Sequence, residues 1–141
     1  MKRIVGLVCA LVLLSLVPAA PGAIKITKIY FDSPGSDTGS NSSLNAEWIR
    51  LKNTGNRAKS LRGWKITDAS GHRYRFGRYR LAAGKTVTIH TGRGSNRPRH
   101  RYWRQDWYVW NNDGDRAKLR NRSGRLIDRC SYSGSGDWVA C

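Results

Sequence analysis

The chain has 141 residues, with 26 lysines and arginines against 9 acidic residues, and its formal charge is +17 at pH 7. This length allows one domain of ordinary size but not two separate hydrophobic cores. Six tryptophans, six tyrosines and two phenylalanines argue against a disordered basic chain, because such chains are poor in aromatic residues. Fifteen glycines and the absence of a helix-rich composition disfavour a coiled coil or a helical bundle.

The chain begins with a short basic segment, followed by an apolar run over residues 4–17 and then by small residues and prolines. A membrane-spanning helix needs about 20 apolar residues, so this run is too short to span. It predicts a secretory signal peptide over residues 1–23, cleaved after Ala19 or Ala23. An uncleaved N-terminal anchor is the alternative. We expect the mature protein, residues 24–141, to be one secreted domain that keeps nearly all of the basic excess.

The first predicted strand covers residues 24–31, and its apolar alternation slips near Lys28, as at a β-bulge. A polar loop over residues 32–43 follows. Residues 46–53 alternate again between apolar and polar side chains, which predicts a second strand. The Asn-Thr-Gly-Asn sequence at residues 53–56 is typical of a hairpin turn.

Further short strands are predicted in the second half of the chain, separated by turns rich in glycine, asparagine and aspartate. After an apolar segment at residues 61–66, these strands cover residues 72–76, 85–91, 107–110, 116–120 and 125–132. Several short strands spaced about ten residues apart predict an all-β sandwich or barrel.

Several sequence motifs occur in an order that resembles a known family. They are Asn-Ala-Glu-Trp-Ile at residues 45–49, Leu-Lys-Asn-Thr-Gly at 51–55, Leu-Arg-Gly-Trp-Lys-Ile-Thr-Asp at 61–68, Leu-Ala-Ala-Gly at 81–84 and Asn-Asp-Gly-Asp at 112–115. From about residue 24 to residue 132 the chain resembles the lamin tail domain. The resemblance implies an immunoglobulin-like β-sandwich, and similar domains occur in exported bacterial proteins, alone or beside nucleases and other hydrolases. The arginine-rich segment 93–105 departs from the family pattern.

Structural roles explain most of the motif residues. We expect Leu61 and Trp64 to fill the core between the sheets, with Gly63 permitting a bend or a close approach of the backbone. Asp68 is expected to accept hydrogen bonds from turn amides, and Glu47 to pair with a nearby arginine.

The sequence offers no recognisable catalytic or metal site. The three histidines, His72, His90 and His100, are scattered, and no nucleophile motif is present. Clustered carboxylates and histidines that could hold a catalytic metal are missing, and residues 112–115 lack the ligand pattern of a calcium loop and predict a hairpin turn instead. We therefore expect no enzymatic activity, no metal and no cofactor. A small metal-dependent hydrolase with an unrecognised site is the alternative.

The mature chain retains two cysteines, Cys130 and Cys141. An even pair in an exported protein predicts a disulfide, here one that closes a short loop and attaches the C-terminus to the last predicted strand. Two free thiols or an intermolecular bridge are the alternatives.

Two basic segments contain interleaved aromatic residues, and they supply the candidate polyanion-binding residues. These are Arg93, Arg97, Arg99, Arg101, Tyr102, Trp103, Arg104, Arg73, Arg75, Arg78 and Arg80. The guanidinium group binds phosphate through two hydrogen bonds and stacks on aromatic rings, and basic grooves with exposed aromatics hold single-stranded nucleic acid. A third basic segment covers residues 116–125. The alternative is that the arginines only face solvent while the aromatics point inward: we place Trp107 and Trp110 in the core and leave Tyr102 and Trp103 open.

A charge excess of this size weakens the compact state by self-repulsion, which a polyanionic partner would relieve. The sequence therefore predicts a secreted, non-catalytic monomer that binds extracellular nucleic acid or an anionic cell-wall polymer. An acidic protein partner is the alternative. The mature chain contains no predicted transmembrane segment, and no amphipathic helix or lipid anchor favours the membrane surface.

Overall fold

The computed structural model describes residues 23–141. The predicted signal peptide, with its possible cleavage after Ala19, therefore lies outside the described residues except for Ala23. Within the described part, no helix is long and apolar enough to cross a membrane. The elements are β1 (Ile24–Tyr30), α1 (Asn41–Asn45), β2 (Trp48–Asn53), β3 (Lys59–Ser60), β4 (Lys65–Thr67), β5 (Arg73–Arg75), β6 (Arg80–Leu81), β7 (Thr86–His90), β8 (His100–Tyr102), β9 (Asp115–Arg120), β10 (Leu126–Tyr132) and β11 (Trp138–Ala140).

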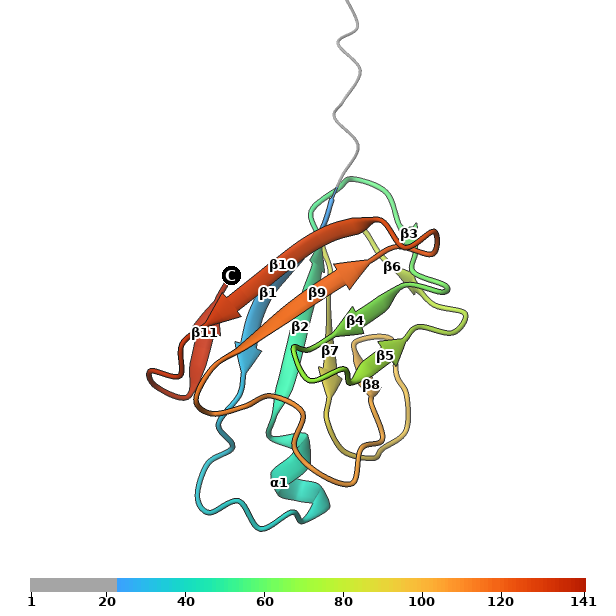
Figure 1. Ribbon diagram of the computed structural model, residues 1–141. Helices are drawn as coiled ribbons and strands as arrows, with labels where there is room; N and C mark the ends of the chain where they lie inside the picture. The colour runs from blue at the N-terminus through green and yellow to red at the C-terminus, as the bar shows by residue number, and fades with distance from the viewer. Residues whose placement is uncertain (1–22) are drawn as a thin grey trace, which may run out of the picture.

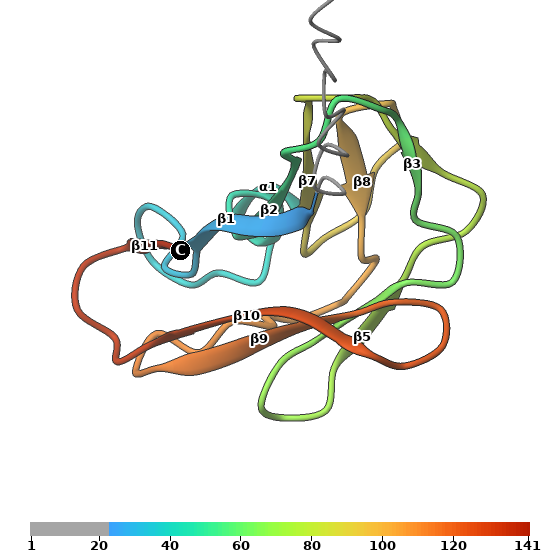
Figure 2. The same ribbon diagram turned by 90° about the horizontal axis from the view of Figure 1, so that it is seen from above.

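Two sheets pack face to face. The first has the strand order β11-β1-β2-β7-β8 and the second the order β10-β9-β4-β5, while β3 and β6 form a separate pair at one end (Figure 1). Figure 2 shows the two layers from above. All pairs are antiparallel except β7 with β8. The structure is thus the immunoglobulin-like β-sandwich that the family resemblance implied.

Alternation along the strands builds the core between the sheets. In β2, for example, Ile49 and Leu51 are buried while Trp48 and Arg50 are only partly covered. The core combines apolar residues of both sheets with aromatic residues: Ile26, Ile29, Phe31, Ile66, Phe76, Val87, Ile89, Trp103, Trp110, Ala117 and Leu119. Leu61 and Trp64 lie in this core, as predicted.

The predicted bulge is confirmed, whereas the predicted hairpin after the second strand is not. The register of β1 against β2 shifts between Ile26 and Lys28, which is the expected bulge. The turn at residues 53–56, however, does not close a hairpin. The buried Asn53 side chain accepts a hydrogen bond from Gly55 N and donates to the carbonyls of Arg57 and Leu81, so the chain leaves the sheet toward the β3–β6 pair.

The predicted strand at residues 107–110 is wrong. The amides of Val109 and Trp110 donate to the Glu47 carboxylate, so a buried side chain takes the place of a neighbouring strand. Trp110 lies in the core as expected, whereas Trp107 is 62% exposed and does not. Because no strand precedes it, the turn at residues 111–114 is not a hairpin turn. The elements α1, β3, β6, β8 and β11 were not predicted from the sequence.

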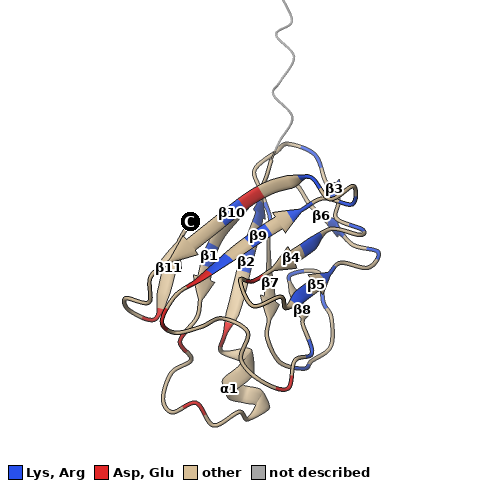
Figure 3. Cartoon of the chain, in the orientation of Figure 1, with Lys and Arg blue, Asp and Glu red and all other residues tan. Residues whose placement is uncertain are grey.

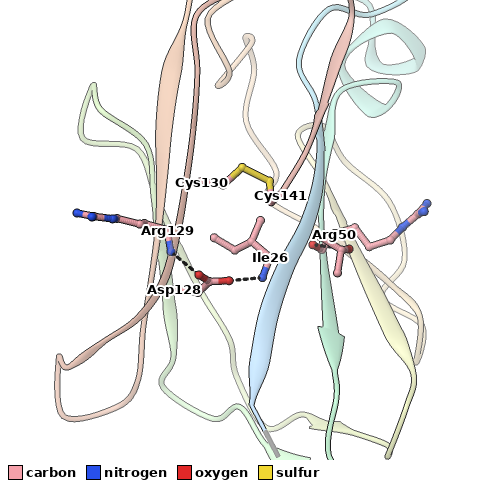
Figure 4. Close-up of a disulfide and its surroundings, with 7 residues drawn as sticks. Ile26, Arg50, Asp128, Arg129, Cys130 and Cys141 are labelled. Atoms are coloured by element: carbon pink, nitrogen blue, oxygen red, sulfur yellow. Dashed lines mark hydrogen bonds between the residues drawn. A yellow bond between two sulfur atoms is a disulfide. The ribbon is translucent and has the colours of Figure 1, made fainter.

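The disulfide between Cys130 and Cys141 is present and joins the two sheets (Figure 4). Cys130 lies on β10 in one sheet, and Cys141 follows β11, which pairs with β1 in the other. Beside it, an Asp128 carboxylate oxygen accepts a hydrogen bond from Ile26 N at 2.9 Å, at the β1 bulge. The C-terminal end of the chain is therefore tied to both layers at one edge.

Candidate polyanion-binding surface

The outer face of the four-stranded sheet is lined with basic side chains. Along β9, Ala117 and Leu119 point into the core, so the alternation turns Arg116, Lys118 and Arg120 outward. The same alternation operates in β5, where buried Tyr74 lies between two exposed arginines.

The strand register brings these cations together. Lys65 on β4 is paired with both Arg75 and Arg120, and Lys118 is paired with Arg129 on β10. Neighbouring strands lie about 4.8 Å apart, so these charges are close neighbours. The basic face, as we call it, consists of Lys65, Arg73, Arg75, Arg116, Lys118, Arg120 and Arg129.

The carboxylates of these four strands point away from the basic face. Asp115 accepts hydrogen bonds from the amides of Ala69 and Asn111, and Asp128 reaches across to Ile26 in the other sheet. Figure 4 shows Arg129 directed outward, on the side opposite to Asp128 and Ile26, and Figure 3 shows the basic segments on β4, β5 and β9. Like charges paired across strands repel each other, so this face is destabilising until an anion neutralises it.

The structure separates the predicted arginines into different places. Arg73 and Arg75 belong to the basic face, whereas Arg78 and Arg80 are exposed on the segment that leads from β5 into β6. Lys65 and Arg129 were missed as candidates. Lys65 could have been found, because it lies between the core residues Trp64 and Ile66 and must point outward.

The arginine-rich segment 93–104 surrounds β8, and two of its arginines are held in separate contacts. Arg93 forms an exposed ion pair with Asp106 at 2.7 Å. The guanidinium carbon of Arg101 lies 4.7 Å from the centroid of the Tyr79 ring. Arg97, Arg99 and Arg104 are exposed.

The two aromatic residues of this segment differ in exposure. Trp103 is only 6% exposed, and its ring packs against Trp110 and Tyr74, so it is part of the core and not an open stacking surface. Tyr102 is half-buried on β8. The predicted role of Trp103 in ligand contact therefore has no exposed ring to support it.

Glu47 is buried and does not pair with an arginine, contrary to the prediction. One carboxylate oxygen accepts hydrogen bonds from the Thr91 hydroxyl at 2.6 Å and from the amides of Val109 and Trp110. Burial raises the pKa of Glu47 to about 7, although these three hydrogen bonds act in the opposite direction. Glu47 therefore has a structural role, because it holds the 109–110 segment against the five-stranded sheet.

Asp68 accepts turn amide bonds, as predicted. One carboxylate oxygen accepts from Ser70 N and His72 N, and the other lies 2.6 Å from the Nδ1 atom of His72. These contacts close the turn between β4 and β5. Among residues 23–141, no group of three or more histidine, cysteine or acidic side chains gathers as a metal site would require.

An open pocket of about 760 Å³ lies beside the β9–β10 turn. Its lining combines cations with apolar side chains: Ala23, Ile24, Lys59, Trp64, Asn121, Arg122, Ser123, Arg125 and Ile127. The Asn121 side chain accepts hydrogen bonds from the amides of Ser123 and Arg125, which fixes the turn. Lys59, Arg122 and Arg125 in this lining therefore place further positive charge at this end of the molecule.

Comparison with known proteins agrees with the architecture. The family model described as Lamin Tail Domain matches residues 17–134. No curated protein matches the chain. The motifs that resemble this family occupy the positions that build the sandwich, with Trp64 in the core and Asp68 in the β4–β5 turn. The chain belongs to the lamin tail domain family.

Proposed function

We propose that this protein is a secreted, non-catalytic and monomeric lamin tail module that binds polyanions. The ligands we propose are extracellular DNA and the anionic polymers of a cell envelope. The observation that carries the proposal is the basic face, where seven cations share one sheet surface and the carboxylates of the same strands point elsewhere.

Three further features support this proposal. The basic face extends over four neighbouring strands of one sheet, which suits a long charged polymer better than a small ligand. The disulfide between Cys130 and Cys141 fits an oxidising compartment, in agreement with a signal peptide over residues 1–23. Arg78, Arg80, Arg97, Arg99 and Arg104 are exposed outside the basic face and add to the overall positive charge of the surface.

The test is equilibrium binding to duplex DNA and to a purified anionic cell-wall polymer across a salt series. Binding through phosphate contacts releases counterions, so the logarithm of the affinity should fall linearly with the logarithm of salt concentration, by about 0.9 for each contact to DNA. If neither polymer binds at low salt, the proposal is wrong. Capture of an acidic protein from a nuclease-treated secreted fraction, without binding to either polymer, would favour the protein-interaction alternative.

A further inference from the structure

The outer face of the five-stranded sheet carries a row of rings that crosses every strand. The residues that carry these rings are paired in register from each strand to the next. They are Trp138 on β11, Tyr30 on β1, Trp48 on β2, His90 on β7 and Tyr102 on β8. The centroids of Tyr30 and Trp48 are 5.6 Å apart, and those of His90 and Tyr102 are 5.1 Å apart. Trp138 is 49% exposed and the other four are partly exposed.

Cations occupy the next row of the same face. Lys28 and Arg50 are register partners, and Figure 4 shows Arg50 directed away from the core. The Lys28 ammonium lies 3.7 Å from the centroid of the Trp138 ring, and the Arg50 guanidinium carbon lies 4.5 Å from that of Trp48. These cation–π contacts hold charge and ring side by side.

Polar contacts fix the arrangement of the two rows. The Nε atom of Arg50 donates to the Thr88 hydroxyl at 3.2 Å. The Nε2 atom of His90 lies 3.0 Å from the Nδ1 atom of His100. His100 continues the row of Arg50, because Thr88 is the register partner of both residues, so this contact joins the two rows. The Nδ1 atom of His90 hydrogen-bonds to the carbonyl of Asn45.

This face has no acidic side chain from its own strands. The sequences of β1, β2, β7, β8 and β11 contain neither aspartate nor glutamate. A third row adds Lys25 and Lys52, which are also register partners. An anionic ligand would therefore meet attraction and no repulsion from the sheet itself.

We infer that this face, which we call the ring face, binds single-stranded nucleic acid. Bases would stack on the row of rings while phosphates contact Lys28, Arg50 and the third row. Aromatic rings beside cations on an open sheet are the combination that unpaired bases and their phosphates require. In a duplex the flat faces of the bases are already covered, and a neutral glycan would leave the cations unused. This inference rests on the proposed function in one respect only, namely that the ligand is an anionic polymer.

The experiment compares three ligands: an oligothymidylate, an abasic strand of the same length, and a DNA duplex. The abasic strand keeps the phosphates and removes the bases. We expect the wild-type protein to bind the oligothymidylate at least about fivefold more tightly than the abasic strand, because one stacked base contributes about that much affinity.

Two alanine variants, one conservative replacement and one control variant locate the effect. Trp138→Ala and Trp48→Ala should each weaken oligothymidylate binding by about fivefold or more, and should change affinity for the abasic strand and the duplex by less than about twofold. Trp48→Phe should restore most of the loss, because it restores a ring. Trp107→Ala removes an exposed tryptophan that belongs to no strand of this sheet and should leave all three affinities unchanged. Trp138→Ala suffices if Trp48→Ala fails to fold, because half of the Trp138 surface is already exposed.

Equal affinity for the oligothymidylate and the abasic strand would overturn the inference, as would equal losses in the Trp138→Ala and Trp107→Ala variants. Tighter binding to a sulfated polysaccharide that depends on Trp138 would also overturn it, in favour of a glycan ligand. Failure of the proposed function has a different signature, namely that neither duplex DNA nor the cell-wall polymer binds at low salt.

Discussion

At the scale of single residues, Glu47 shows how one buried carboxylate can replace a strand. It accepts hydrogen bonds from the amides of Val109 and Trp110, so a segment of aromatic and β-branched residues folds without a strand partner. The sequence motif around Glu47 predicted an ion pair, because an acidic residue in so basic a chain has many possible partners. Burial was the missing information, and it depends on contacts from residues about sixty positions away.

Glu47 should make stability depend on pH. Its folded-state pKa, about 7, is above its ordinary value of 4.5, so its contribution is fully present below about pH 4.5 and is lost as the pH rises through 7. In Glu47→Gln this dependence should disappear. Relative to wild type, the variant should gain up to about 3 kcal/mol in unfolding free energy between about pH 5 and about pH 8. Urea unfolding at both pH values measures this, and parallel pH profiles for the two proteins would contradict it.

Gly63 should be sensitive to substitution because of its backbone conformation. Its φ is +76°, and a Cβ atom there would lie 3.0 Å from the Cγ atom of Arg122. We expect Gly63→Ala to lower the unfolding free energy by about 1–2 kcal/mol. Gly77→Ala is the control, because its φ is not in the left-handed region and no atom lies within 4 Å of the added carbon. Similar stabilities of the two variants would show that the bend does not need glycine.

At the scale of secondary-structure elements, alternation identified the strands that bury one side. The predicted segments 24–31, 46–53, 85–91, 116–120 and 125–132 correspond to β1, β2, β7, β9 and β10. β8 was missed because its residues are polar and charged and do not alternate, and because its parallel pairing with β7 follows from tertiary packing. β11 is three residues long, and its place beside β1 depends on the disulfide and on long-range pairing.

The disulfide should stabilise β11 and, through it, the edge of the sandwich. Cys130 and Cys141 are 11 positions apart, for which chain entropy predicts about 3 kcal/mol. We expect Cys141→Ser to lose about that much unfolding free energy. A reductant should lower the stability of wild type to a similar value and leave Cys141→Ser unchanged. If the reductant has no effect on wild type, the bond does not carry this stability.

At the scale of the whole molecule, the basic excess resolves into two sheet faces with different chemistry. The predicted binding residues are arginines that are close along the chain. The basic face instead joins residues of four strands, and Lys65 and Arg129 belong to it only through the strand register. The rings of the ring face come from five strands and are dispersed in the sequence. Neither face could be predicted without the strand order, which side-chain periodicity does not determine.

The central claim is that the basic face, and not positive charge in general, binds polyanions. The most direct measurement is the salt dependence of duplex DNA binding by two variants with equal loss of charge. One replaces Arg73, Arg75, Arg116 and Arg129 by glutamine, and the other replaces Arg78, Arg97, Arg99 and Arg104 by glutamine; all eight arginines are exposed.

We predict that the first variant loses about one unit of salt slope for each arginine that contacts phosphate, while the second keeps a slope close to that of wild type. Equal losses in the two variants, or a larger loss in the second, would contradict the account.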